Sequence, residues 1–169
     1  THNLTVFLYA EDAWLRGKGC VHEGVVSTRL WLPGIPESAE TTALARDLLL
    51  IEQTGVRAHF THLSSARAVH MIARAQQEGL PVSTGVSAHQ LYLTEMDVSD
   101  FNSDCHVIPP LRGLRDRDGL RAGVAQGIIG AICSDHQPHD PDAKLAPFMA
   151  TQPGISALET LLPLTLRLV

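Results

Sequence analysis

One residue with a clear capacity for chemistry ends an apolar segment of the chain. Residues 56–62 alternate in character, so that Ala58, Phe60 and His62 share one face, and His62 ends it. An imidazole at a strand end can bind a metal or move a proton. Taken alone, His62 is more often expected to be a hydrogen-bonded structural residue at a strand end, and the neighbouring strand changes that balance.

A second polar cluster follows the apolar segment 128–133. By the same alternation Asp135 shares a face with Ile129, and it opens the motif Asp135-His-Gln-Pro-His139. An aspartate beside two histidines suits zinc in ligand type, and the aspartate can also act as a general base. Pro138 argues against a helix that would align the two histidines. Two alternatives stay open, a metal or proton-transfer site and a loop held by an Asx turn.

The remaining polar candidates carry weaker signals. His22 and His89 are placed where they could line a pocket, while Glu11-Asp12 could either cap the first loop or bind a ligand. The other histidines are expected to be surface or packing residues, because none of them ends an apolar strand face: His59, His70 and His106.

Strand-like and helical segments alternate along the chain. Residues 4–9, 56–62, 81–86 and 128–133 have the composition of strands. Helical spacing of apolar residues marks 37–53, a segment capped by Ser64 that closes at Gly79, and a segment near 116–126. Strands followed by helices in series predict an α/β fold with parallel strands, right-handed crossovers and outer helices.

The polar residues at the strand ends decide between two α/β architectures. A GxGxxG fingerprint is missing after the first strand, which lowers a dinucleotide-binding interpretation. In a (β/α)8 barrel the chemistry is built at the carboxyl ends of the strands, where His62 and Asp135 fall. A full barrel takes about 250 residues. We therefore expect residues 1–169 to be a single partial domain, the C-terminal half of a TIM-like barrel whose N-terminal half lies upstream.

Composition excludes several classes of partner. The formal net charge is −5, from 13 Lys and Arg against 18 Asp and Glu, so no nucleic-acid partner is expected. No apolar run approaches the roughly 18 residues that a membrane span needs, so no membrane is expected. The three cysteines lie at wide spacing and fit neither a disulfide framework nor a metal knuckle, which indicates a reducing, cytoplasmic location.

Five motifs in order make the chain resemble the second half of dihydroorotase, in the amidohydrolase superfamily: residues 32–40, 61–65, 109–112, 134–139 and 154–160. The resemblance implies a zinc-dependent cyclic amidohydrolase of pyrimidine biosynthesis that interconverts N-carbamoyl-L-aspartate and L-dihydroorotate. It implies that His62 binds zinc and that Asp135 binds zinc and is catalytic. It further implies that His139 contacts the substrate carboxylate and that Gly154 approaches the substrate ring.

Two positions depart from the family pattern. Tyr9 stands where the family has a zinc-ligating histidine, and a phenol is a poor replacement for imidazole at zinc. Ile108 stands where the family has an asparagine that hydrogen-bonds the substrate, and its side chain can neither donate nor accept. The pattern resembles noncatalytic dihydroorotase-like subunits that assemble with aspartate transcarbamoylase.

The resemblance leaves two hypotheses. One is an impaired or inactive protein with one zinc ion or none and a structural role, with aspartate transcarbamoylase or self-association as the partnership. The other is an active zinc-dependent dihydroorotase acting on its small-molecule substrate. The first is favoured because a zinc ligand and a substrate hydrogen bond are replaced at Tyr9 and Ile108.

Overall fold

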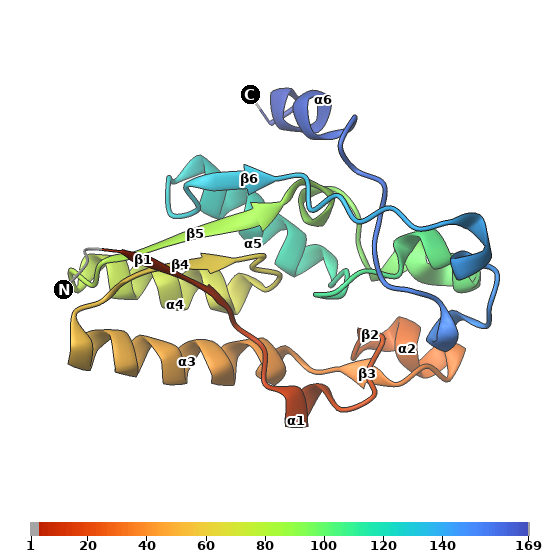
Figure 1. Cartoon of the computed structure of the whole chain (residues 1–169), viewed down its shortest axis with the longest axis horizontal. Helices are drawn as coiled ribbons and strands as arrows, with labels where there is room; N and C mark the ends of the chain where they lie inside the picture. The colour runs from red at the N-terminus through yellow and green to blue at the C-terminus, as the bar shows by residue number, and fades with distance from the viewer. Residues whose placement is uncertain (1–3, 169) are drawn as a thin grey trace.

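A parallel four-stranded sheet forms the centre of the computed structural model, which describes residues 4–168. The strands follow the order β1-β4-β5-β6, and every neighbouring pair is parallel (Figure 1). Their bounds are β1 Thr5–Tyr9, β4 Arg57–Thr61, β5 Val82–Ser87 and β6 Ala131–Cys133. The predicted α/β fold with parallel neighbouring strands is confirmed.

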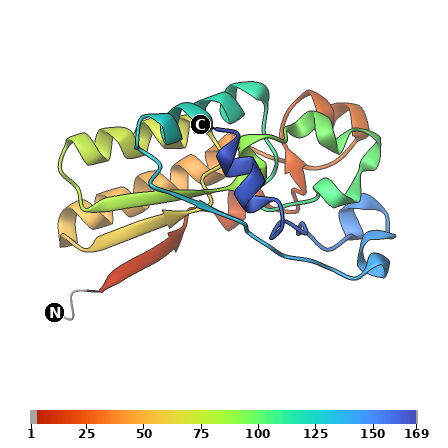
Figure 2. The same cartoon turned by 90° about the horizontal axis from the view of Figure 1, so that it is seen from above.

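Three longer helices lie on one side of this sheet (Figure 2): α3 Glu37–Thr54, α4 Ala66–Gln77 and α5 Leu114–Ala125. Helix α3 ends at Gly55, which adopts the left-handed conformation that glycine tolerates best. Helix α4 begins at Ser65, whose hydroxyl accepts from the Ala68 amide. The prediction of Ser64 as the cap was wrong by one residue, because the Ser64 side chain is engaged elsewhere. None of the helices in residues 4–168 has the length and apolar composition needed to cross a bilayer.

Shorter elements surround the ends of the strands. Two residues each of β2 and β3 form a second, parallel pair that the sequence patterns did not predict. The short strands and helices are β2 Val21–His22, β3 Gly34–Ile35, α1 Ala13–Arg16, α2 Val25–Leu30 and α6 Leu161–Leu166. The 3₁₀ helices are η1 Ala88–Leu91, η2 Glu95–Phe101, η3 Ser103–Cys105, η4 Pro141–Lys144 and η5 Phe148–Ala150.

The main core lies between the sheet and these three helices. Phe60 on β4 is fully buried, and it shares one hydrophobic cluster with Leu44 of α3, Ile72 of α4 and Leu120 of α5. On the opposite face of the sheet Phe7 is 70% exposed. The apolar strand face therefore packs against the helices, since burying apolar surface is the main favourable term in folding.

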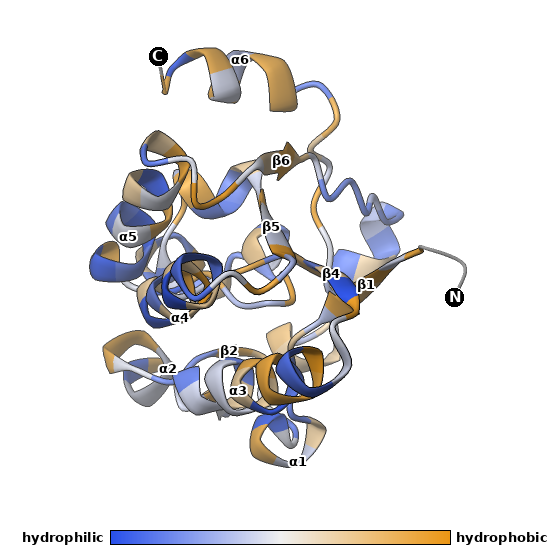
Figure 3. Cartoon of the chain, turned by 90° about the vertical axis from the view of Figure 1, so that its left-hand side faces the viewer, coloured by the Kyte–Doolittle hydropathy of each residue, from blue (hydrophilic) through white to orange (hydrophobic). Residues whose placement is uncertain are grey.

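Strand β6 differs from its prediction. It spans only Ala131–Cys133, whereas the apolar run predicted a strand over 128–133, and Ala131 is exposed. Ile129 leaves the strand to pack in the core. Helix α6 lies beyond β6, and its ribbon is largely hydrophobic in colour (Figure 3), with Leu162 66% exposed. As the outermost strand of the sheet, β6 is paired on one side only, with β5.

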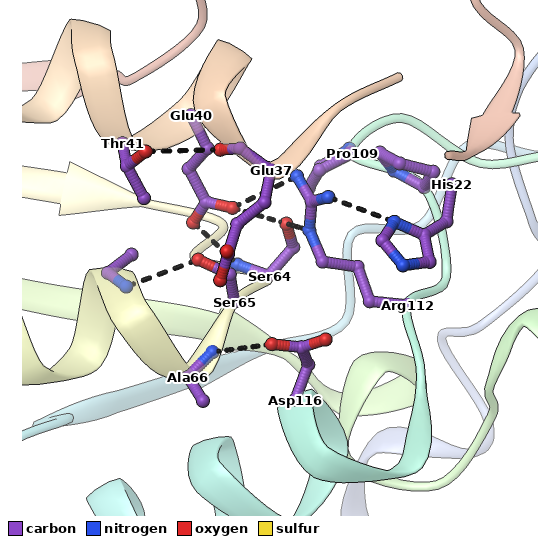
Figure 4. Close-up of polar contacts among 12 residues, drawn as sticks. His22, Glu37, Glu40, Thr41, Ser64, Ser65, Ala66, Pro109, Arg112 and Asp116 are labelled. Carbon is purple, nitrogen blue, oxygen red and sulfur yellow. Dashed lines mark hydrogen bonds and ion pairs between the residues drawn. The ribbon is translucent and has the colours of Figure 1, made fainter. Parts of the chain in front are cut away.

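A buried ion pair ties three segments together just below the ends of the strands (Figure 4). Arg112 donates to the Glu40 carboxylate at 3.2 Å, and the two side chains are only 2% and 7% exposed. Ser64 joins them: its hydroxyl donates to Glu40 at 2.6 Å and accepts from Arg112 Nε at 2.7 Å. Glu40 also accepts from the Ser64 amide at 2.9 Å. The network therefore links helix α3, the loop after β4 and the segment before α5.

Close packing of α4 against α5 gives a first prediction. A methyl group at Gly119 would lie 3.0 Å from Ala66 Cα and would overlap its side chain, whereas one at Gly130 would meet open space. We expect Gly119→Ala to destabilise the fold by about 1–2 kcal/mol, because crowding outweighs the gain in helix propensity. Gly130→Ala is the matched control and should change stability by less than about 0.5 kcal/mol. Urea unfolding checks both, and equal stability of the two variants would contradict the packing.

The buried ion pair gives a second prediction. Arg112→Met should lower the free energy of unfolding by about 3–5 kcal/mol, because it leaves the Glu40 carboxylate buried without its cation. Arg115→Met is the control, since Arg115 pairs with Glu37 at 3.4 Å while 74% exposed. Exposed pairs contribute about 0–1 kcal/mol. Denaturant unfolding measures both variants. Equal losses of unfolding free energy would show that the buried Arg112 pair stabilises the fold no more than an exposed pair does.

Candidate active site

The two residues singled out from the sequence meet at the carboxyl ends of the strands. His62 follows β4 directly and Asp135 follows β6, and His62 Nε2 lies 3.4 Å from Asp135 Oδ1. Ser87, the last residue of β5, donates its hydroxyl to Asp135 Oδ2 at 3.1 Å. Parallel neighbouring strands bring their ends to one rim, so residues 73 positions apart in the sequence become a contacting pair.

Both residues leave their strands in an unusual backbone conformation. The φ angle is 55° at His62 and 49° at Asp135, in the left-handed region that non-glycine residues seldom adopt. Such positions cost roughly 1–3 kcal/mol each and cluster at functional sites. The strand alternation used to place these side chains ends at this turn. Their meeting at the rim therefore comes from the turns and the sheet, and not from a shared strand face.

A cavity of about 410 Å³ opens beside this pair. Its lining includes both predicted ligands, His62 and Asp135, and both departed positions, Tyr9 and Ile108, together with Arg16. These side chains come from β1, from α1 and from three separate loops. Five positions that could recognise or transform a ligand thus face one space of a size that fits a small molecule.

Tyr9 stands next to His62 at the mouth of the cavity. The two rings are edge to face, with centroids 6.2 Å apart. Loss of water around the hydroxyl raises the pKa of Tyr9 far above its ordinary value, and the nearby Glu11 and Glu40 carboxylates act in the same direction. The residue at this position is therefore a neutral phenol at physiological pH. A neutral phenol is a much weaker metal ligand than an imidazole.

The described residues include two side chains that could bind zinc. His62 and Asp135 fit zinc in ligand type, and their donor atoms lie close together. A catalytic zinc takes three protein ligands and keeps a position for water. Within residues 4–168 no group of three or more His, Cys, Asp or Glu side chains is arranged to hold a metal ion. These residues alone do not fit a complete catalytic zinc site.

His139 and Gly154 lie together on two loops beside the cavity. The His139 ring nitrogen Nε2 lies 3.0 Å from the Pro153 carbonyl oxygen. Gly154 has φ 150°, and a side chain there would approach His139 Nε2 to 2.9 Å. Lys144 holds the second loop by donating to the carbonyls of Gln152 and Gly154. Glycine is thus required at position 154 by its conformation and by this close approach.

Two other histidines do not line the cavity, contrary to one of the roles considered for them. Arg112 donates to His22 Nδ1 at 3.2 Å, which makes His22 an extension of the buried ion pair (Figure 4). His89 is 3% exposed, and neither of its ring nitrogens has a partner among the described residues. Its burial lowers its pKa to about 4. His22 is therefore part of the buried network, whereas His89 is buried outside the cavity lining.

The acidic pair near the first strand divides into two roles. Asp12 caps α1, accepting from the amides of Trp14 and Leu15 at 3.0 and 2.9 Å. Glu11 accepts from Arg16 at 3.1 Å. Sequence reasoning missed Arg16, because its position in the cavity depends on the turn of α1. It also gave no role to Glu40, although the motif that contains Glu40 was noted.

Comparisons with known proteins agree with these motifs. Residues 2–68 match the family described as dihydro-orotase-like. The chain is 58% identical over 169 residues to a dihydroorotase-like protein of Pseudomonas putida, covering 100% of this chain and 40% of that relative. It is 44% identical over 168 residues to a dihydroorotase of Anaeromyxobacter sp. (strain K), covering 98% and 39%. The chain thus spans about two fifths of the length of these relatives.

Solved structures share the fold. A D-hydantoinase (dihydropyrimidinase) from Thermus sp. superposes with a TM-score of 0.82 at 24% identity, covering 98% of this chain and 38% of that one. A dihydroorotase from Saccharomyces cerevisiae has a TM-score of 0.76 at 20% identity, covering 98% and 44%. The predicted α/β fold of a partial barrel with parallel strands is confirmed. By sequence, this chain is similar to dihydroorotase-like proteins and to dihydroorotases, as its motifs predicted.

Proposed function

We propose that the full-length protein is a dihydroorotase-like protein of pyrimidine biosynthesis whose catalysis is impaired or absent. One observation carries the proposal. The cavity that contains His62 and Asp135 is also lined by Tyr9 and Ile108, the two positions at which the family's ligand and substrate donor are replaced. The residues His62 and Asp135 are retained, while one metal ligand and one hydrogen-bonding side chain of the family are replaced.

Each replacement has a physical cost. Tyr9 offers a neutral phenol beside His62, so any metal held there loses one imidazole ligand. Bound zinc would supply an activated water and polarise the substrate carbonyl. Loss of a zinc ligand at Tyr9 should therefore reduce catalysis more than loss of the substrate hydrogen bond at Ile108. Ile108 removes a substrate hydrogen bond, a loss of about 1–3 kcal/mol, or roughly 5- to 150-fold in rate or affinity.

The alternative is a working enzyme, and a specific observation favours it. His62 and Asp135 remain 3.4 Å apart in strained conformations at the rim of the sheet. In that alternative Asp135 takes the proton from the attacking water and passes it to the leaving nitrogen, while His139 and Gly154 position the substrate. His62 and Asp135 would then serve as zinc ligands beside others from outside the described residues.

We also propose a structural partnership, with aspartate transcarbamoylase or with a second copy of the protein. Its support is the exposed apolar surface of the α1–α2 segment, where Trp14 and Trp31 are 95% and 92% exposed. Tryptophan is strongly enriched among residues that dominate protein interfaces. Cys20, Cys105 and Cys133 are all unpaired, which supports the proposed cytoplasmic location.

Metal content and turnover test the impaired site. The purified full-length protein should retain at most one zinc ion after dialysis and show little or no dihydroorotate hydrolysis. Tyr9→His combined with Ile108→Asn should raise both, since it restores an imidazole and a hydrogen-bonding side chain. Elemental analysis and a hydrolysis assay measure these changes. Two tightly held zinc ions with robust turnover that Asp135→Asn abolishes would establish the active enzyme instead.

Size-exclusion chromatography tests the partnership. We expect the full-length protein to co-elute with aspartate transcarbamoylase, or to elute as an oligomer by itself. Replacing Trp14 and Trp31 by serine should abolish the larger species, because it removes the two exposed rings that the partner would bury. Leu49→Ser is the control, since Leu49 is 66% exposed on α3, away from this segment. Elution of the unaltered protein as a monomer in both experiments would refute the partnership.

A further inference from the structure

His22 lies at the edge of the buried ion-pair network, where one side of its ring meets a cation. Its ring nitrogen Nδ1 is 3.2 Å from Arg112 Nη1 (Figure 4). Arginine can only donate hydrogen bonds, so Nδ1 must accept and carry no proton. The neutral ring then holds its single proton on Nε2. The contact with Arg112 therefore exists only while His22 is uncharged.

The other side of the His22 ring approaches Glu95, the first residue of η2. Both side chains lie against Gly24, since a methyl group there would come within 2.9 Å of Glu95 Oε2 and 3.4 Å of His22 Cδ2. Cδ2 adjoins Nε2, so this edge of the ring is the one that carries the proton. Glu95 Oε2 is buried and has no hydrogen-bond partner among the described residues. A buried acceptor without a partner costs free energy, which a donor on His22 would recover.

Charged groups from four segments act on this ring. Burial lowers the pKa of His22, and the Arg112 guanidinium acts in the same direction. The carboxylates of Glu95 on η2, Asp116 on α5 and Glu37 on α3 oppose that change in pKa. The net direction is below the ordinary pKa of 6.5, so the folded chain favours the neutral ring. The stability that His22 contributes is complete above about pH 6.5 and declines as the pH falls further, because the unfolded chain binds the proton more readily.

We propose that His22 is an acid-sensitive switch that changes partners: as a neutral ring it accepts from Arg112, and as an imidazolium it releases Arg112 and donates to Glu95. Two cations repel each other across the Nδ1 contact, whereas an imidazolium and a carboxylate attract. Because Arg112 also bonds to Ser64, the exchange loosens both the β2–α2 segment, residues 21–30, and the loop after β4. The switch requires neither a metal nor turnover, so it is tested independently of the proposed function.

Hydrogen exchange of the full-length protein, followed by mass spectrometry, tests the switch. After correction for the intrinsic exchange rate, protection of the amides in the β2–α2 segment should fall severalfold from about pH 7.5 to about pH 5, because the loosened form binds the proton with an ordinary pKa. His22→Gln should keep the protection nearly constant, since a glutamine carbonyl accepts from Arg112 without titrating. His70→Gln is the matched control and should behave like the unaltered protein, because His70 is exposed on α4.

A second variant separates the exchange of partners from simple loss of the Arg112 contact. Glu95→Gln offers the imidazolium a neutral amide in place of a carboxylate, so the loss of protection should move to lower pH. A loss at unchanged pH in this variant, or a pH dependence that persists in His22→Gln, would overturn the proposal. The circular dichroism spectrum at neutral pH shows whether each variant is folded. If His22→Gln does not fold, the result for Glu95→Gln decides the question by itself.

Discussion

The buried ion pair between Glu40 and Arg112 is the interaction on which the candidate site depends. Two charges removed from water are tolerated only when their hydrogen bonds are satisfied. Ser64 meets that requirement by bonding to both partners. Because Ser64 lies two residues after His62, the pair also fixes where the chain goes once β4 has ended. The position of His62 follows from this constraint as much as from the strand itself.

The candidate site near this ion pair retains the two strand-end residues and differs from the family pattern at two other positions. His62 and Asp135 occupy costly left-handed conformations, which the surrounding structure must stabilise. The same cavity has a neutral phenol at Tyr9 and an apolar side chain at Ile108. A metal centre needs a complete ligand set. Among the described residues, the cavity offers His62 and Asp135 as possible ligands and no group of three or more arranged to hold a metal ion.

One side of the sheet carries most of the stabilising contacts. Phe60 and the other apolar residues of that face pack against α3, α4 and α5, while Phe7 on the opposite face is exposed. The catalytic rim of a barrel lies at the strand ends, so its geometry is set by strand order and register and not by which face is covered. This explains how His62 and Asp135 meet although much of the sheet surface is exposed.

Much of the fold was predictable because its signals are local. The spacing of Leu44, Leu48 and Ile51 defined α3, alternation around Phe60 defined β4, and strands followed by helices predicted the parallel order. The pairing of His62 with Asp135 was also predictable, since both follow strands whose ends meet at one rim. Strand β6 was mispredicted because an apolar run does not reveal that a strand lies at the edge of a sheet.

Other features required the tertiary structure, because they depend on contacts between distant segments. The sequence by itself determined the order of the main strands and helices, the residues at the strand ends and the residue types at Tyr9 and Ile108. Only the folded chain decided that Arg112 reaches Glu40 across 72 positions and that Arg16 lines the cavity. Periodicity records which face of an element is buried, but the partner of a charged side chain is chosen by where the folded chain brings other segments beside it.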